Sequence, residues 1–292
     1  MIVRLSFSFP IGENIVLENF SGFVARGLFY SILSIIDEDL AKSIHDAQTI
    51  APYSCSPIYT VDGGKIKLFS TVITAGRSRF DAILLDEKLI ETLTDVRNLR
   101  CINGAKIRVH SHTTVIDKID VEVIHEKTLY TETTYKKFKV TFLTPTFFKK
   151  PCPYIPRRYI EGGKVKLQRK PNSIIYLYPD PQLLFNNIIR VWEKFLPGKP
   201  GSLEKFKTWI EYGGLVISEH KLKTVKVTEH KSTDKYQRGF IGWIKLTATD
   251  MNPEMLKLAH ILLKFAEMVG VGGCRTAGFG RIKVKEPNNK EN

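Results

Sequence analysis

Glycine and arginine residues that could grip an anion are concentrated near the end of the sequence. Five glycines fall within the eleven positions from Gly270 to Gly280, and Arg275 and Arg281 accompany them. Glycine lets the backbone approach a ligand closely and turn successive N–H groups toward one point. Two arginines make a phosphodiester the expected ligand. On the loop alone, a connection needed only for chain reversal remains the alternative. The residues expected to contact the anion are Gly270, Gly272, Gly273, Arg275, Thr276, Gly278, Gly280 and Arg281.

A basic segment lies between a predicted strand at Phe138 and a predicted helix at Pro181. Glu161 is the only acidic residue from Lys149 to Lys170. Basic groups neutralise phosphates and aromatic faces stack on unpaired bases, so the segment is suited to a single strand of RNA, although a solvated face remains the alternative. The basic residues are Lys149, Lys150, Arg157, Arg158, Lys164, Lys166, Arg169 and Lys170, and the interleaved aromatic residues are Phe147, Phe148, Tyr154 and Tyr159.

His45 is the histidine best placed for proton transfer. Asp37 is the expected N-cap of a short helix whose core face carries Leu40, Ala41 and Ile44, and His45 falls at the end of that helix, off the core face. Histidine is the side chain whose charge changes near neutral pH. A structural role at the helix end is the alternative interpretation.

Cofactor and metal motifs are not indicated. Arg275 replaces the third glycine of a dinucleotide-binding fingerprint, and no Gly-Lys-Ser/Thr follows the loop as in a P-loop. His110 and His112 would share one face of a strand, but without a nearby carboxylate or cysteine we expect a solvated or RNA-facing pair, and no metal. The cysteines stand singly, at Cys55, Cys101, Cys152 and Cys274, so neither zinc binding nor a disulfide framework is expected.

The elements that must position these residues follow the order β-α-β-β-α-β twice. This order predicts an α+β fold of two tandem ferredoxin-like domains, a plan shared with RNA-recognition modules, at residues 1–136 and 137–292. The first domain would hold the candidate catalytic site, and the second the basic segment and glycine-rich loop.

The first domain is predicted to contain six elements or regions. They are a strand Ile2–Phe9, a helix Phe20–Ile36, the helix after Asp37, a hairpin of Pro57–Val61 with Lys65–Thr74 around Asp62-Gly63-Gly64, a helix capped by Asp86, and a β region Ala105–Val123.

The second predicted domain repeats this order of elements. On its last helix, we expect His260 to lie in a polar surface stripe, and we expect Trp243 to face the core. The predicted elements are strand Phe138–Leu143, helix Pro181–Leu196, strands Gly214–Val227 and Phe240–Ala248, helix Pro253–Val269 and strand Phe279–Val284.

Composition narrows the class of partner. The 292 residues are 43% apolar, enough for two globular cores. Lysine and arginine outnumber aspartate and glutamate by 44 to 30, and the net charge of +14 favours a polyanion such as RNA. No apolar run approaches the roughly 20 residues of a membrane span and no signal-like start is visible, so we expect a cytoplasmic protein without a membrane partner.

Several stretches in the same order resemble the Cas6 family, the CRISPR-associated endoribonucleases of archaeal type. Phe265–Gly272 and Gly278–Val284 are similar to the closing helix, glycine-rich loop and strand of that family. Leu28–Tyr30, Phe142–Thr146 and Gly239–Trp243 agree with it. The resemblance extends over nearly the whole chain.

The resemblance implies a nuclease and hydrolase of antiviral defence that cuts CRISPR precursor RNA within its repeats. The implied cleavage needs no metal or other cofactor: a 2′-hydroxyl attacks the adjacent phosphorus and leaves a 2′,3′-cyclic phosphate and a 5′-hydroxyl. The implied partner is CRISPR repeat RNA or crRNA. A Cascade-type effector complex and a homodimer are further assemblies that the resemblance leaves open.

The resemblance also implies a catalytic set in the first domain. In many archaeal members a tyrosine in the first helix, a histidine about fifteen residues later and a lysine soon after it form the site, and Tyr30 and His45 have that spacing. No lysine follows His45 up to Ser54, so Lys42 is the candidate for the third role. The alternative is a Cas6-like protein that holds repeat RNA but cuts it poorly or not at all.

Overall fold

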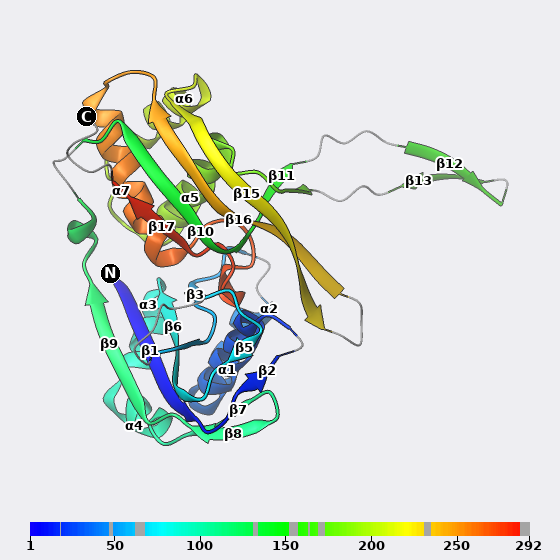
Figure 1. The fold of residues 1–292 in the computed structure, drawn as a ribbon, viewed down its shortest axis with the longest axis vertical. Coiled ribbons are helices and arrows are strands. Elements are labelled where there is room, and N and C mark those ends of the chain that lie inside the picture. The colour runs from blue at the N-terminus through cyan, green and yellow to red at the C-terminus, as the bar shows by residue number, and fades with distance from the viewer. Residues whose placement is uncertain are drawn as a thin grey trace.

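The chain forms two similar halves, each with a four-stranded antiparallel path through its main sheet and helices packed on one face of that sheet (Figure 1). The structure is a computed structural model. It describes residues 1–17, 19–46, 49–61, 68–130, 134–151, 157–162, 164–168, 173–230 and 235–286.

The first half has the strand order β3-β6-β1-β9, in which the first and third strands of the β-α-β-β-α-β series are central. This is the ferredoxin-like arrangement, and it confirms the predicted fold class. Phe7 of β1 lies opposite Phe80 of β6, and both side chains are fully buried. The elements are β1 Ile2–Ile11, β2 Ile15–Val16, α1 Ser21–Ile36, α2 Glu38–Asp46, β3 Tyr53–Cys55, β4 Tyr59–Thr60, β5 Val72–Ile73, β6 Gly76–Leu84, α3 Glu87–Thr94, α4 Val96–Ile102, β7 Lys106–Val109, β8 His112–Val115, β9 Lys118–Ile124 and the 3₁₀ helix η1 Glu126–Leu129.

The second half repeats this order as β15-β16-β10-β17. Phe138, Val140 and Phe142 of β10 point alternately into a core covered by α5 and α7. The elements are β10 Lys137–Thr146, β11 Phe148–Pro151, β12 Arg157–Glu161, β13 Lys164–Gln168, β14 Ser173–Tyr176, α5 Pro181–Phe195, α6 Leu203–Glu211, β15 Leu215–His230, β16 Lys235–Ala248, α7 Pro253–Val269, the 3₁₀ helix η3 Arg275–Ala277 and β17 Ile282–Lys285.

Aspartate caps fix where several helices begin. The carboxylate of Asp37 accepts the Leu40 N–H at 2.8 Å ahead of α2, and Asp86 accepts the Leu89 N–H at 3.1 Å ahead of α3. Both caps were predicted from the sequence and are confirmed. Each satisfies a backbone donor that the first helical turn leaves without a partner.

The strand pairing in the first half differs from the prediction. Instead of joining a hairpin partner, β4 pairs with β6, and β5 pairs with β2. Residues 62–67, which include the predicted turn Asp62-Gly63-Gly64, lie outside the described residues. The central strand β6, which the sequence reading missed, pairs with β1, β3 and β4 because its alternating Phe80, Ala82 and Leu84 fill the core.

Two predictions of side-chain exposure are also wrong. His260 is only 2% exposed, because its Nε2 meets Glu286 Oε1 at 2.7 Å and its ring lies 5.2 Å from that of Tyr135. Trp243 is only half-buried and faces away from the core residues Ile244 and Leu246.

The two halves meet through a small aromatic cluster. Phe20, which precedes α1, lies 5.4 Å from Phe279 between ring centroids, and Phe147 lies 6.0 Å from Phe279. Gly22 of α1 has no room for a side chain, since a β-carbon there would overlap the Ala277 carbonyl oxygen. The glycine-rich loop is therefore held directly against the start of α1.

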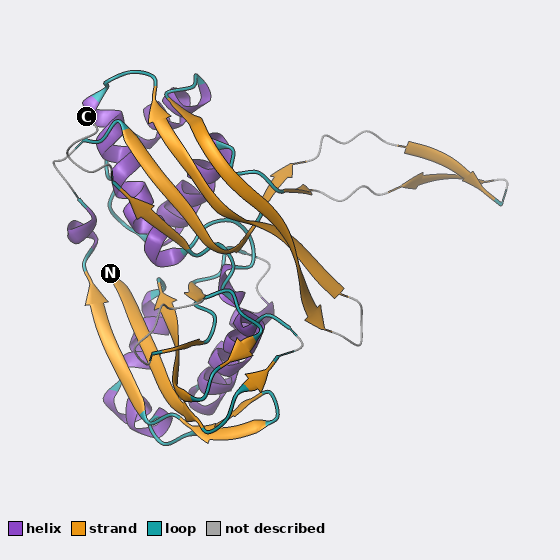
Figure 2. Cartoon of the chain, viewed as in Figure 1, coloured by secondary structure: helices purple, strands orange, loops and turns teal. Residues whose placement is uncertain are grey.

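Two small two-stranded sheets extend from the second half. One consists of β11 and β14, and the other, far from the two main sheets, consists of β12 and β13 (Figure 2). Among the described residues, no helix combines the length and apolar character needed to cross a membrane.

Candidate functional site

Tyr30 and His45 come together at the surface of the first half. Tyr30 lies on α1 and His45 in the last turn of α2, and the sharp turn at Asp37 folds the two helices against each other. The ring centroids are 5.4 Å apart at 67°. His45 is 70% exposed, and its Nδ1 lies 2.9 Å from Asp46 Oδ1. Within the described part of the chain Nε2 has no bonding partner, so it is available to a ligand.

Tyr53 of β3 extends this pair into the core, and the sequence reading did not single it out. Its ring stacks on Phe29 at 4.3 Å and meets Tyr30 edge-on at 6.0 Å. Burial, followed by the nearby Cys55 and Tyr30, raises the pKa of Tyr53 well above its usual range. The buried hydroxyl therefore stays protonated, and the Tyr53 ring packs behind Tyr30.

The cations around this pair differ from the prediction. Lys42 Nζ lies 2.8 Å from Glu38 Oε1 on the exposed face of α2, so its charge is already paired. Arg26 lies one turn before Tyr30 on α1, on the same side of that helix. Burial raises the pKa of Tyr53, and the positive charge of Arg26 lowers it. Arg26 is therefore close enough to act electrostatically on Tyr53. The spacing of Arg26 and Tyr30 is visible in the sequence, but only the structure brings Arg26 close to Tyr53.

The glycine-rich loop uses its N–H groups inside the protein. The Gly272 N–H donates to Asn187 Oδ1 at 2.7 Å, and that of Gly273 to the Phe147 carbonyl at 3.0 Å. Gly280 has φ 70°, and a β-carbon there would overlap the Val271 carbonyl oxygen. The expectation of convergent free N–H groups is therefore wrong for these positions, because the glycines serve close packing. Further N–H groups satisfied within the protein are those of Gly270, Val271, Gly278 and Gly280.

Both loop arginines are turned inward. Arg275 is 6% exposed and donates from Nη1 to the Val269 carbonyl and from Nη2 to the Ala51 carbonyl. Burial lowers the pKa of the Arg275 guanidinium to about 10. Arg281 donates from Nη1 to the Met268 carbonyl at 2.7 Å, and burial lowers its pKa as well. The expectation of two phosphate-facing arginines is corrected: these guanidinium groups bind backbone carbonyls.

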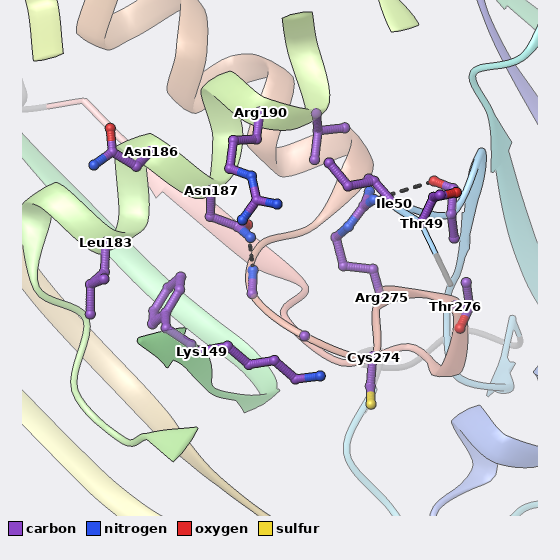
Figure 3. Close-up of a pocket in the computed structure, with 15 residues that line it drawn as sticks. Thr49, Ile50, Lys149, Leu183, Asn186, Asn187, Arg190, Cys274, Arg275 and Thr276 are labelled. Atoms are coloured by element: carbon purple, nitrogen blue, oxygen red, sulfur yellow. Dashed lines mark hydrogen bonds between the residues drawn. The ribbon is translucent and has the colours of Figure 1, made fainter. Parts of the chain in front are cut away.

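A pocket of about 590 Å³ lies beside this loop, between the two halves (Figure 3). Asn186, Arg190 and Lys149 line it with donors, and Arg275 forms part of its wall. No carboxylate is among its lining residues in the described chain, so the pocket is suited to an anion. The lining residues are Thr49, Ile50, Ala51, Phe148, Lys149, Leu183, Asn186, Asn187, Arg190, Val191, Gly272, Gly273, Cys274, Arg275 and Thr276.

The α5 residues of this pocket were missed by the sequence reading, although a signal was present. Asn186, Asn187 and Arg190 lie at three- and four-residue spacings opposite the buried Leu184 and Ile188. Such a polar stripe is usually only solvated, and the docking of the glycine-rich loop is what converts it into a pocket wall.

The basic segment is only partly described. Lys149 and Lys150 are exposed, and Lys150 Nζ lies 5.6 Å from the centroid of the Tyr176 ring. Phe147 and Phe148 are 1% and 2% exposed, so the expectation that they are open to bases is wrong, since both belong to the core. The backbone of Arg157, Arg158, Lys164 and Lys166 forms the β12–β13 hairpin, whereas Tyr154, Arg169 and Lys170 lie outside the described residues.

The predicted pairing of His110 and His112 on one strand face is wrong. His110 occupies the turn between β7 and β8 with φ 57°, and His112 Nε2 lies 2.7 Å from Glu13 Oε1. Among the described residues there is no group of three histidine, cysteine or carboxylate side chains placed to hold a metal ion.

Comparisons with known proteins agree on one family. The model of the CRISPR-associated endoribonuclease Cas6 family matches residues 140–282. The fold resembles a product complex of the Thermus thermophilus Cas6 protein TTHB231, with a TM-score of 0.71 and 20% identity over 98% of this chain and 100% of that one. A product complex of the Cas6 protein TTHA0078 gives a TM-score of 0.67 and 19% identity over 98% and 100%.

More distant structures extend the same likeness. A Cas6-related protein from Pyrococcus furiosus has a TM-score of 0.55 and 15% identity over 99% of this chain and 100% of that one. No curated protein matches the chain in sequence. At these identities the structures show a common fold across both halves, and the family match covers the strand, helices and glycine-rich loop of the second half. Residues 140–282 therefore match the Cas6 family model, and the whole chain shares its fold with solved Cas6 structures.

Proposed function

We propose that the chain is an endoribonuclease that cleaves CRISPR precursor RNA within its repeats and so generates crRNA. The observation that carries this proposal is the contact of the Tyr30 and His45 rings, 5.4 Å apart, on the half of the molecule against which the glycine-rich loop packs. The match of residues 140–282 to the Cas6 family model and a fold common to Cas6 product complexes support it. We place the reaction in the cytoplasm and take a Cascade-type effector complex as the receiver of the product.

The proposed chemistry is a transesterification within the RNA strand. The 2′-hydroxyl oxygen attacks the adjacent phosphorus, the bond from phosphorus to the 5′-oxygen breaks, and the products carry a 2′,3′-cyclic phosphate and a 5′-hydroxyl. One proton leaves the 2′-oxygen and one joins the 5′-oxygen. His45 serves as general acid or base through its open Nε2, and Tyr30 orients the reacting groups or shares the proton transfer. No metal ion takes part in this scheme.

A cation is still needed for the crowded phosphorane. We assign this role to Arg26 ahead of Lys42, because Glu38 already pairs with Lys42 whereas Arg26 lies on the side of α1 that carries Tyr30. Lys149, Asn186 and Arg190 would hold the RNA backbone at the pocket beside the loop.

Cleavage of a labelled repeat RNA in excess EDTA tests the proposal. The wild-type protein should cut a repeat from the same genome as the chain. His45→Ala should slow this cleavage by about 100-fold or more, and a 2′-deoxy substitution at the nucleotide before the cut should abolish product. Persistence of cutting in the 2′-deoxy substrate would contradict the proposed nucleophile. Loss of wild-type cutting in EDTA that added Mg²⁺ restores would contradict metal independence.

A second function is favoured by one specific observation. The chain has no lysine between His45 and Ser54, and Lys42 is bound to Glu38, so the catalytic set of the family is incomplete. A protein that holds repeat RNA without efficient cleavage would follow. Tight, specific binding of the repeat by wild-type protein with no product in single-turnover reactions would favour this alternative.

A further inference from the structure

The outer faces of the two equivalent sheets carry different chemistry. In the first half the cations on this face are paired: Arg4 Nη1 lies 2.6 Å from Glu122, and Lys118 Nζ lies 2.9 Å from Asp120. Arg79 likewise bonds Asp81 at 3.0 Å. This face is therefore close to neutral and internally bonded, and it offers little attraction to a polyanion.

The corresponding face of the second sheet carries lysines around a tryptophan. Strand register places Lys221 of β15 and Thr141 of β10 on either side of Trp243 in β16. The next row aligns Lys245, Lys139 and Lys285 on β16, β10 and β17. In Figure 2 the strands of this sheet lie in front of its helices, so the row faces away from α5 and α7.

Charge on this face is not balanced. Glu219, the acidic residue of these rows, accepts from Lys245 Nζ at 2.7 Å. The hydrogen bond from Lys245, and then the charges of Lys245, Lys139 and Lys137, lower the pKa of Glu219. Lys221 and Lys285 add further positive charge, and both are exposed.

Trp243 is placed to act as a stacking surface. It is half-buried, and Lys139 Nζ lies 4.2 Å from its ring centroid. A cation beside a partly exposed aromatic ring is a combination that can hold single-stranded RNA, since the ring can stack on a base and the cation can neutralise the neighbouring phosphate. An acidic protein partner could pair with the lysines, but its binding would not require the Trp243 ring.

We propose that the face formed by Lys139, Lys221, Trp243 and Lys285 binds a single-stranded RNA segment that flanks the repeat. The proposal rests on the proposed function for the identity of the RNA, and it adds a second contact region remote from Tyr30 and His45. It concerns affinity for the flank and leaves the chemistry of cleavage unchanged.

Binding of two kinds of RNA tests this proposal. One is the repeat alone, and the other is the repeat with an unstructured extension of about eight nucleotides, made once with the extension at the 5′ end and once at the 3′ end. For the wild-type protein the extension at one end should tighten Kd roughly tenfold, as expected for about one stacked base with its phosphates. Trp243→Ala combined with Lys139→Ala should abolish that gain, and Trp243→Phe should retain most of it. Lys118→Ala, on the paired face of the first sheet, is the matched control and should keep the full gain.

The outcomes separate this inference from the proposed function. Equal Kd values for the repeat and both extended RNAs with wild-type protein, or an undiminished gain in the Trp243→Ala, Lys139→Ala variant, would overturn the inference. Single-turnover cleavage of the repeat alone should be unchanged in that variant, which also shows that it is folded. If wild-type protein never cuts but the extension still tightens binding through Trp243, the proposed function fails and the inference stands.

Discussion

At the scale of single residues, the candidate site combines one exposed proton carrier with a rigid support. His45 is 70% exposed, whereas the neighbouring Tyr53 is fully buried. Substitution of His45 therefore removes little packing. This separation of chemistry from stability makes the residue a clean target for mutation.

We expect His45→Ala to slow cleavage by about 100-fold or more, the usual loss for a general acid or base, while the Kd for repeat RNA stays within about twofold. Single-turnover rates with saturating protein measure the first quantity, and titration of labelled RNA measures the second. His112→Ala is the control, since His112 is also a histidine paired with a carboxylate but lies on β8. A rate close to that of wild type for His45→Ala would remove the residue from the mechanism.

Arg275→Ala should act on stability more than on RNA affinity. Its guanidinium satisfies the carbonyls of Val269 and Ala51, and loss of these bonds in a buried site should lower the free energy of unfolding by about 1–3 kcal/mol. Chemical denaturation measures the change. Unchanged stability with a flatter salt dependence of RNA binding would instead return Arg275 to the phosphate-binding role expected from the sequence.

At the scale of elements, the longer and strongly periodic segments were predictable. The helices at Pro181 and Pro253 and the long strands of the second sheet begin and end near the expected residues, since length and amphipathic pattern agree there. β6 was missed although its charged residues Arg77, Arg79 and Asp81 alternate with buried ones, the pattern of a half-buried strand. These charges are held on the outer face by bonds from Arg77 to Asp117 and from Arg79 to Asp81 and Asp120. Similarly, His260 was misplaced because its partner Glu286 is distant in sequence.

The candidate site was predictable only in part, because some of its contacts join residues that are distant in sequence. Tyr30 and His45 were proposed because their spacing matches the pattern implied by the resemblance to the Cas6 family, with the helix-end position of His45 as the only independent signal. The inward turn of Arg275 and the surroundings of Arg26 depend on contacts between segments far apart in sequence, which no local pattern encodes.

Two glycines of α1 provide a test of how the loop docks. Gly22→Ala would place a methyl group on the Ala277 carbonyl, and the resulting overpacking should lower the free energy of unfolding by about 1–3 kcal/mol. Gly27 has open space around it, so Gly27→Ala should raise stability by about 0.5–1 kcal/mol through helix propensity. Thermal or chemical unfolding of both variants gives the comparison, and equal effects at the two positions would contradict the close approach of the loop.

At the scale of the whole molecule, two copies of one topology have come to differ in charge. The outer sheet face of the first half is ion-paired, whereas the pocket between the halves and the outer face of the second sheet are basic. The net charge of +14 belongs to the second half, because residues 1–136 contain 15 basic and 17 acidic residues and residues 137–292 contain 29 and 13.

The salt dependence of RNA affinity should show which basic residues contact phosphates. The affinity for repeat RNA should fall steeply as salt rises, and Lys149→Ala with Arg190→Ala should reduce the slope of log K against log salt by up to about 1.4, near 0.7 for each phosphate contact with a single strand. Lys88→Ala with Arg97→Ala, on exposed helices of the first half, should leave the slope unchanged. Equal slopes for both double variants would exclude the pocket as a phosphate site.

The aromatic cluster of Phe20, Phe147 and Phe279 has a consequence for synthesis of the protein. Tyr30 and His45 leave the ribosome long before the segment around Ala277 and Phe279 that packs on the start of α1. Because synthesis proceeds from the N-terminus, a nascent chain carries the catalytic candidates before it has the pocket beside the glycine-rich loop. Translation products that stop before this loop would therefore hold the tyrosine–histidine pair without the pocket.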